Sequence, residues 1–442
     1  MASTMIATLI MTSLRNLIWI YLWLLIFEGA LRKWIIPSLD APLLIIRDPF
    51  VIWIYFQAWR NGLSFNNAFF AANLVLAVAT AILSSFFGLG NLLLTLYGLR
   101  TDYLQVPLIF LIPQILNRDD VVAMGRFLFY LSIPMTVLVI LQFRSAPDSL
   151  LNKGTMTTHY GTVRPSGTFS FGPGVTTFFT MTSVFVLYGY IQARTYKIWL
   201  MIPVTIAILI ASACSGSRNC LVSIGLVAVV AILCVVIRGK GVGGIIVAAV
   251  AIALALFVVS TTTVGQEGFD QLNQRIEDAG QTEGGGEGFV ARFFNSMLSP
   301  LLSMGQAPFF GYGLGLGTTA ALSLSPNDLY WPENEWDRLI FECGPIFGFL
   351  LIAFRIALTL AVAKRAFEAY RRDNILPLLL FAFCGLLILN GQWGVGPTIL
   401  GFAVLGGGLT LAACEEPEEE DQEEEEEAEN QLDHSPAADT VG

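Results

Sequence analysis

Charged residues are scarce in this chain: they make up 13% of its 442 residues, whereas hydrophobic residues make up 55%. Soluble domains carry about a quarter charged residues, so the composition excludes an ordinary soluble domain. Histidine occurs only at His159 and His434, and the six cysteines show no metal-ligand spacing. The cysteines lie in or beside apolar runs, and we interpret them as small packing residues rather than as metal ligands or a disulfide framework.

Long apolar runs dominate instead and predict an all-α, polytopic transmembrane bundle over residues 1–413. Runs of about 20 apolar residues are typical of membrane-spanning helices, and their continuous character excludes a β-barrel. The first run has no small-residue cleavage site and is followed by Arg32-Lys33-Trp34, so we expect an anchor rather than a signal peptide. We recognise about twelve runs, at roughly 14–31, 43–59, 66–87, 100–117, 121–143, 173–193, 198–213, 219–237, 242–262, 339–361, 375–391 and 396–413.

Acidic residues are concentrated at the C-terminal end. Residues 414–442 carry 14 of the 34 Asp and Glu and no Lys or Arg, so the remainder has 24 basic and 20 acidic residues. A low-complexity acidic run of this kind predicts a disordered tail. It serves either as a solubilising appendage or as a docking segment.

Basic residues in short turns indicate which loops face the cytoplasm. These clusters lie at Arg194 and Lys197, at Arg238 and Lys240, and between residues 364 and 372. Alternating the spans from them predicts that both termini are cytoplasmic. Two loops then lie on the outer face: 144–172, and a large loop at 263–338 between the ninth and tenth spans.

The basic residues expected on the outer face are mostly arginines. A guanidinium group grips a phosphate at two points, so this bias favours an anionic substrate on that face. A single arginine at the end of a span can instead snorkel to lipid headgroups, but a set of seven is harder to explain in that way. The seven are Arg100, Arg144, Arg164, Arg218, Arg275, Arg292 and Arg338.

The large outer loop has an internal organisation of its own. Residues 269–278 predict a short helix, and the glycines at 284–286 predict a hinge. Phe289 to Met304 predict an amphipathic helix at the membrane interface, with Arg292 available to a headgroup.

Four segments, taken together, resemble bacterial O-antigen polymerases and O-antigen ligases. The glycine-rich Pro-Phe-Phe-Gly-Tyr-Gly-Leu-Gly, downstream of two spaced arginines, is similar to a segment in the large outer loop of that family. An Arg-Pro-Ser-Gly-Thr-Phe turn and a Ser-Gly-Ser-Arg sequence resemble two further family motifs. The segments occur in matching order between about residues 100 and 350, at 164–169, 215–218, 308–315, and Asn334 with 342–348.

The resemblance implies a helical glycosyltransferase of the C type at the outer face of a bacterial inner membrane. Such an enzyme takes a glycan from a polyprenyl-diphosphate carrier. A polymerase passes the glycan to another lipid-linked repeat, and a ligase passes it to a lipid or other acceptor. Neither a metal nor another cofactor is required. The expected partners are the polyprenyl-diphosphate-linked oligosaccharide, membrane lipids and other polysaccharide assembly proteins, and not nucleic acid.

One position departs from the ligase pattern. Glu333 stands where ligases commonly place a histidine before the residue that matches Asn334, which weighs against a ligase and against a histidine-based mechanism. We therefore expect an inverting polymerase. A ligase, or a non-catalytic scaffold of a polysaccharide export machine, remains the alternative. His159, a lone loop histidine near Arg164, is more readily explained as incidental than as catalytic. A transporter is disfavoured because the sequence has no convincing internal repeat.

The chemistry assigns a role to each candidate residue. Fixed arginines stabilise the negative charge that develops on a departing diphosphate. The acceptor hydroxyl needs a general base, for which Glu333 and Glu335 are the candidates, although Glu335 can instead pair with Arg338 in a surface turn. Aromatic residues such as Tyr312 can stack on sugar rings or simply belong to an interfacial belt. The predicted substrate-binding residues are Arg164, Arg218, Arg275, Arg292, Arg338, Tyr312 and Asn334.

Two charged segments near the N-terminus have no place in this mechanism. They are Glu28 to Trp34 and Arg47-Asp48-Pro49. We expect them either to shape the cavity or to bind lipid headgroups.

Overall fold

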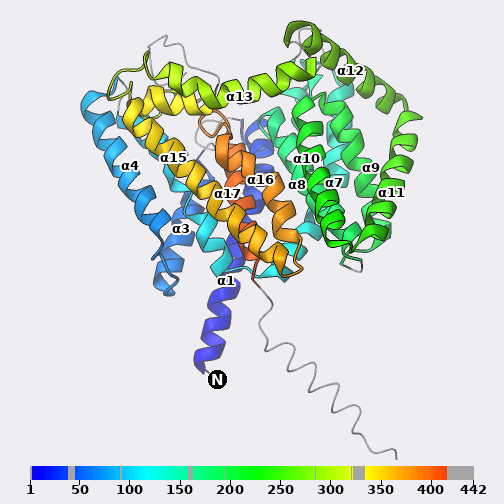
Figure 1. The fold of residues 1–442 in the computed structure, drawn as a ribbon, viewed down its shortest axis with the longest axis horizontal. Coiled ribbons are helices and arrows are strands. Elements are labelled where there is room, and N and C mark those ends of the chain that lie inside the picture. Colours follow the sequence, from blue (N-terminus) through cyan, green and yellow to red (C-terminus); the bar gives the residue numbers. More distant parts are fainter. Residues whose placement is uncertain are drawn as a thin grey trace, which may run out of the picture.

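The chain folds as a multi-pass helical membrane protein (Figure 1). Among the residues that the computed structural model describes, eight helices are long and apolar enough to cross a membrane. The other four predicted spans form shorter or broken helices. The described residues are 2–37, 45–89, 92–157, 163–193, 195–283, 285–319, 321 and 334–415, so most of the acidic tail lies outside them.

The first part of the chain contains both continuous and interrupted helices. Its continuous elements are α1 (Ala2–Ala30) with the π-helical turn η1 (Leu31–Ile35), α3 (Arg47–Arg60), α4 (Ala68–Phe87) and α5 (Leu92–Leu99). The run predicted at 100–117 is divided into η3 (Arg100–Leu104), α6 (Leu108–Leu111) and η4 (Ile112–Gln114). Pro107 and Pro113 lie at these divisions, where the missing N–H group of proline interrupts the helical hydrogen bonds.

Five consecutive spans form the middle of the chain. They are α7 (Arg118–Arg144), α8 (Gly172–Ile191), α9 (Ile198–Ser215), α10 (Arg218–Arg238) and α11 (Val242–Ser260). A capping box of Asn117 and Asp120 begins α7, which satisfies two N–H groups that the helix leaves free. The loop between α7 and α8 holds η5 (Leu150–Asn152) and the antiparallel strands β1 (Met156–Thr157) and β2 (Val163–Arg164).

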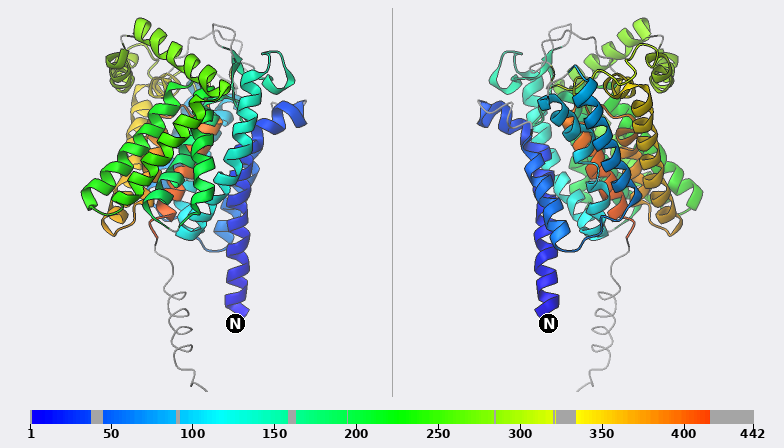
Figure 2. Two further views of the ribbon diagram at one scale, coloured as in Figure 1. Left: turned by 90° about the vertical axis from the view of Figure 1, so that its right-hand side faces the viewer. Right: turned by 90° about the vertical axis from the view of Figure 1, so that its left-hand side faces the viewer.

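Two helices lie across one end of the bundle rather than through it. They are α12 (Thr263–Glu283) and α13 (Gly285–Ser303), and both views in Figure 2 place them at the end opposite the N-terminus. The helix predicted at 269–278 lies within the longer α12, and most of the predicted amphipathic helix lies within α13. Their position across the helix ends is what an interfacial segment requires.

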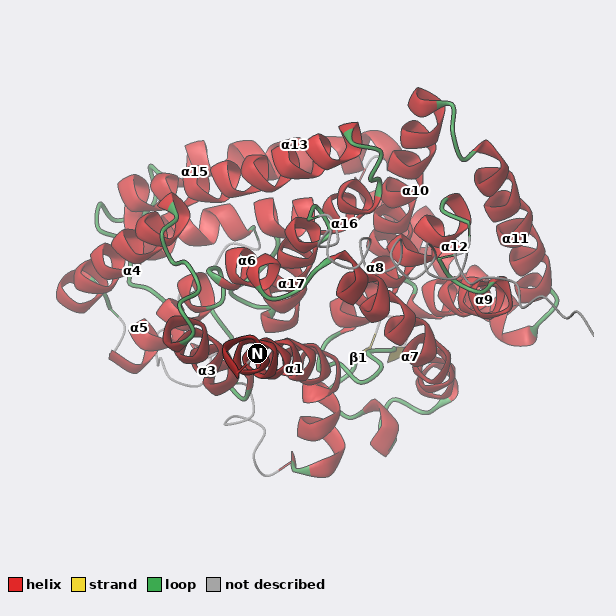
Figure 3. Cartoon of the chain, turned by 90° about the horizontal axis from the view of Figure 1, so that it is seen from below, coloured by secondary structure: helices red, strands yellow, loops and turns green. Residues whose placement is uncertain are grey.

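The last three helices are α15 (Glu335–Arg371), α16 (Leu376–Asn390) and α17 (Pro397–Ala412). A break at Gly344, with φ +75°, divides α15 into two helical parts. Viewed from below, α6 and α17 lie inside the bundle, while α4 and α11 lie towards its edges (Figure 3). The N-terminus and the end of α17 lie at the same end of the bundle, as the alternation of spans predicts.

Candidate functional site: two arginine clusters

Three of the predicted arginines lie within electrostatic range of one another at the end of the bundle that α12 covers. Arg164 ends β2, Arg218 is the first residue of α10, and Arg275 lies on α12. The turn between α9 and α10 is so short because Gly216 adopts a left-handed conformation with φ +52°. The Nη1 atom of Arg275 donates a hydrogen bond of 2.8 Å to the carbonyl oxygen of Gly216. We call Arg164, Arg218 and Arg275 the arginine trio.

The members of the arginine trio repel one another. Burial, and then the neighbouring Arg218, lower the pKa of Arg164. Burial, followed by the charges of Arg164 and Arg218, lowers the pKa of Arg275 to about 10. Among the described residues, neither Arg164 nor Arg275 has a carboxylate within ion-pair distance. An anion placed between these guanidinium groups would relieve the repulsion.

The turn after Arg164 is held by Lys33 and Gln142. Lys33 belongs to the charged segment near the N-terminus to which the sequence assigned no role. The Nζ atom of Lys33 donates hydrogen bonds to the Ser166 hydroxyl oxygen at 2.8 Å and to the Gly167 carbonyl oxygen at 3.1 Å. The Oε1 atom of Gln142 accepts from the backbone N–H groups of Ser166 at 3.1 Å and Gly167 at 2.7 Å. Lys33, in the segment Glu28 to Trp34, therefore holds the turn that follows Arg164 rather than binding a lipid headgroup.

A second cluster lies inside the bundle. Arg338 forms ion pairs with Asp102 at 2.5 Å, Glu335 at 2.8 Å and Glu342 at 2.9 Å, and its side chain is 3% exposed. Arg355 pairs with Glu335 at 3.1 Å. Glu335 and Arg338 were predicted to lie at the substrate; the structure places them in this buried cluster, with their charges directed to one another. We call these five residues the buried ion cluster.

The glycine-rich segment closes over the buried ion cluster. The N–H groups of Gly315 and Gly317 donate to the carboxylate of Glu342 at 3.0 and 2.7 Å. A side chain at Gly311 would overlap the backbone carbonyl oxygen of Glu342. Tyr312 donates its N–H group to the Phe341 carbonyl oxygen at 2.7 Å, and its ring stacks on that of Phe341. Glycine is thus needed here for close backbone approach.

The start of α15 is tied to α13. Asp337 accepts hydrogen bonds from the hydroxyl groups of Ser299 at 2.7 Å and Ser303 at 2.8 Å. The side-chain amide of Asn334 donates to the same carboxylate at 3.1 Å. Asn334, predicted to bind substrate, therefore has its side chain at this junction between helices. The carboxylate of Asp337 binds these three donors and not Arg338.

The side chains of three residues named in the sequence analysis lie outside the part of the chain that the structure describes. Glu333 and His159 lie outside the described residues, and Arg292 lies on α13 with its side chain outside them. The roles of Glu333 as a general base and of Arg292 in substrate binding therefore stay predictions.

Two more buried ion pairs explain the second charged segment near the N-terminus. Arg47 pairs with Glu28 at 2.7 Å and donates to the Pro397 carbonyl oxygen at 2.8 Å. Asp48 pairs with Arg100. Charges inside apolar runs are costly unless they are paired. The presence of these charges in apolar runs could therefore have predicted that they pair across helices.

No protein-family model, curated protein or solved structure matches the chain.

Proposed function

We propose that the chain is a glycan polymerase of a bacterial inner membrane, with α12 and α13 on the outer face and both termini in the cytoplasm. It would transfer glycan repeats from a polyprenyl-diphosphate carrier to another lipid-linked repeat. The observation that carries the proposal is that Arg164, Arg218 and Arg275 lie within electrostatic range of one another at the end of the bundle covered by α12. Three guanidinium groups that repel one another favour a multiply charged anion such as a diphosphate.

In the proposed reaction, the diphosphate is the leaving group. The bond between the anomeric carbon and the diphosphate oxygen breaks, and its electron pair remains on that oxygen. The arginine trio stabilises this charge. The acceptor hydroxyl attacks the same carbon from the opposite side, and its proton passes to a general base. Glu333 is our candidate for that base, because the carboxylate of Glu335 is already paired with Arg338 and Arg355.

The buried ion cluster has a supporting part in this proposal. It fixes the first turn of α15, and the bonds from Ser299 and Ser303 to Asp337 connect that turn to α13. Glu333 and Asn334 immediately precede this turn in the sequence. Arg338 would therefore act on the reaction only by positioning the segment before it.

The experiment compares the sizes of surface and lipid-linked glycans in the host after Arg275→Gln or Arg164→Gln, at matched expression. Loss of a charge-assisted hydrogen bond costs about 1.5–3 kcal/mol, so transfer should slow by about tenfold or more. The expected result is collapse of a long ladder to single lipid-linked repeats. Arg144→Gln is the control, because Arg144 is 46% exposed and pairs with Glu267 on α12; it should leave the ladder unchanged.

Two other outcomes separate the alternatives. Long lipid-linked chains that fail to reach their acceptor would identify a ligase. A ladder unchanged by Arg275→Gln, Arg164→Gln and Glu333→Gln would remove the catalytic proposal and leave the scaffold.

A further inference from the structure

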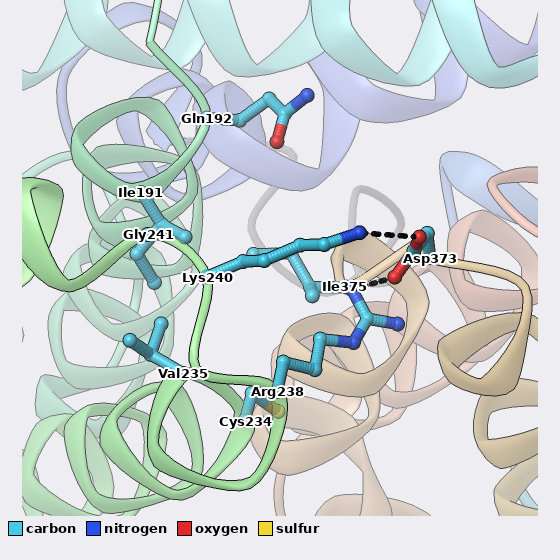
Figure 4. Close-up of a pocket in the computed structure, with 9 residues that line it drawn as sticks. All are labelled: Ile191, Gln192, Cys234, Val235, Arg238, Lys240, Gly241, Asp373 and Ile375. Atoms are coloured by element: carbon cyan, nitrogen blue, oxygen red, sulfur yellow. Dashed lines mark hydrogen bonds and ion pairs between the residues drawn. The ribbon is translucent and has the colours of Figure 1, made fainter.

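A pocket of about 250 Å³ lies at the opposite end of the bundle from α12 (Figure 4). It is formed where α8 and α10 end and where α15 turns into α16. Its lining combines apolar side chains with two cations and one carboxylate. The lining residues are Ile191, Gln192, Cys234, Val235, Arg238, Lys240, Gly241, Asp373 and Ile375.

The charged side chains of the pocket are held in place by their neighbours. Asp373 accepts from Lys240 at 3.2 Å and pairs with Arg238 at 3.6 Å. The guanidinium of Arg238 also lies over the ring of Tyr370, 4.1 Å from its centre. The hydroxyl of Tyr370 in turn donates to the Cys234 carbonyl oxygen at 3.0 Å. Arg238 is therefore fixed in direction, and little of its freedom remains to be lost on binding a ligand.

One hydrogen-bonding group in this pocket lacks an acceptor. The Nη2 atom of Arg238 is buried and has no hydrogen-bond partner among the described residues. A buried donor without an acceptor is unfavourable, so Arg238 has hydrogen-bonding capacity that its ion pair with Asp373 does not use. The pocket is also far larger than the roughly 10–15 Å³ that one water needs.

We propose that this pocket binds the phosphate of an anionic phospholipid headgroup. Arg238, Lys240 and Asp373 together carry a net charge of +1, which one phosphodiester neutralises. A free phosphate dianion would overcompensate that charge. Because Arg238 and Arg371 are the last residues of α10 and α15, the pocket lies at the level where headgroups meet the ends of membrane spans. The proposal does not depend on the reaction proposed above.

The test is native mass spectrometry of the whole protein in detergent, titrated with phosphatidylglycerol, phosphatidylethanolamine or inorganic phosphate. We expect phosphatidylglycerol to bind more tightly than the other two. Lys240→Gln should weaken its binding about fivefold, the factor for one cation near a membrane surface. Lys240 is 77% exposed, so this change should leave the fold intact.

Two further variants make the test specific. Lys364 is also 77% exposed and also pairs with an acid, Glu368, near the same end of α15; Lys364→Gln should therefore leave lipid affinity unchanged. Asp373→Asn should raise the affinity, because it increases the charge of the site to +2. Asn is well suited to the left-handed conformation of this residue, φ +67°. Equal affinities for the two lipids, equal losses in Lys240→Gln and Lys364→Gln, or equally tight binding of inorganic phosphate would each overturn the proposal.

Discussion

The arginine trio and the buried ion cluster both contain arginines, but the two groups differ in exposure and in the number of carboxylates around them. Arg338 is 3% exposed and contacts three carboxylates, whereas Arg164 is exposed and has no carboxylate partner among the described residues. A buried guanidinium needs carboxylates to replace its lost hydration. A partly exposed one keeps part of its hydration and can exchange that water for a ligand. The first arrangement supports the fold, and the second is suited to binding.

The largest expected effect comes from breaking the buried ion cluster. Arg338→Met would leave Asp102, Glu335 and Glu342 in the interior with Arg355 as the nearest remaining cation. Removing one partner of a buried ion pair costs about 3–5 kcal/mol, and we expect a loss of that size in the free energy of unfolding, measured by denaturant titration in detergent. Arg144→Met, which breaks an exposed pair with Glu267, should cost only about 0–1 kcal/mol.

A second variant keeps this prediction decisive if Arg338→Met does not fold. Adding Glu342→Gln removes one of the uncompensated charges, so the double variant should recover part of the lost stability. Equal stability losses in Arg338→Met and Arg144→Met would contradict the contrast between buried and exposed arginines.

An intermediate effect is expected from the glycine-rich segment over the buried ion cluster. Gly311 and Gly62 both have φ +76°, but a side chain at Gly311 would overlap the Glu342 carbonyl oxygen, whereas nothing lies within 4 Å of one at Gly62. Both Ala substitutions bring the strain of a left-handed residue, about 1–2 kcal/mol. Gly311→Ala adds overpacking, typically about 1–3 kcal/mol more. Thermal unfolding of the two variants measures the difference, and equal melting temperatures would refute the close packing of this segment.

The sequence predicted the helical membrane class, because apolar run length is a local property. The assignment of the arginines to the outer face rests on the basic turns and stays a prediction. The sequence did not separate the two arginine groups. Arg338 reaches Asp102 across 236 residues of chain, and no spacing rule contains that contact. Arg355 lies inside the span predicted at 339–361, where an unpaired charge is costly, but the sequence does not identify its partner Glu335. The role of Lys33 was missed because it donates to the turn after Arg164 from a distant helix end.

The smallest effect on stability is expected for Arg275→Gln in the arginine trio. This small effect contrasts with the large loss expected for Arg338→Met. Arg275→Gln loses the hydrogen bond to Gly216, but it also removes a cation whose pKa is lowered to about 10 by burial and by two like charges. A pKa below the ordinary value means that the folded state binds this proton less tightly than the unfolded state does. At neutral pH the charge therefore opposes folding, a penalty that fades as the pH rises through 10. The two losses offset each other, and we expect a change within about 0.5 kcal/mol.

Inorganic pyrophosphate distinguishes a binding role of Arg275 from no role at all. Pyrophosphate at 100 times its dissociation constant should stabilise the wild-type protein by about 2.7 kcal/mol, and Arg275→Gln should lose most of that gain. Arg144→Gln should keep it, because Arg144 belongs to an exposed pair with Glu267. A stability loss in Arg275→Gln as large as that of Arg338→Met, or stabilisation by pyrophosphate that is unchanged in Arg275→Gln, would mean that the trio supports the fold as the buried cluster does. The distinction between the two arginine clusters would then be wrong.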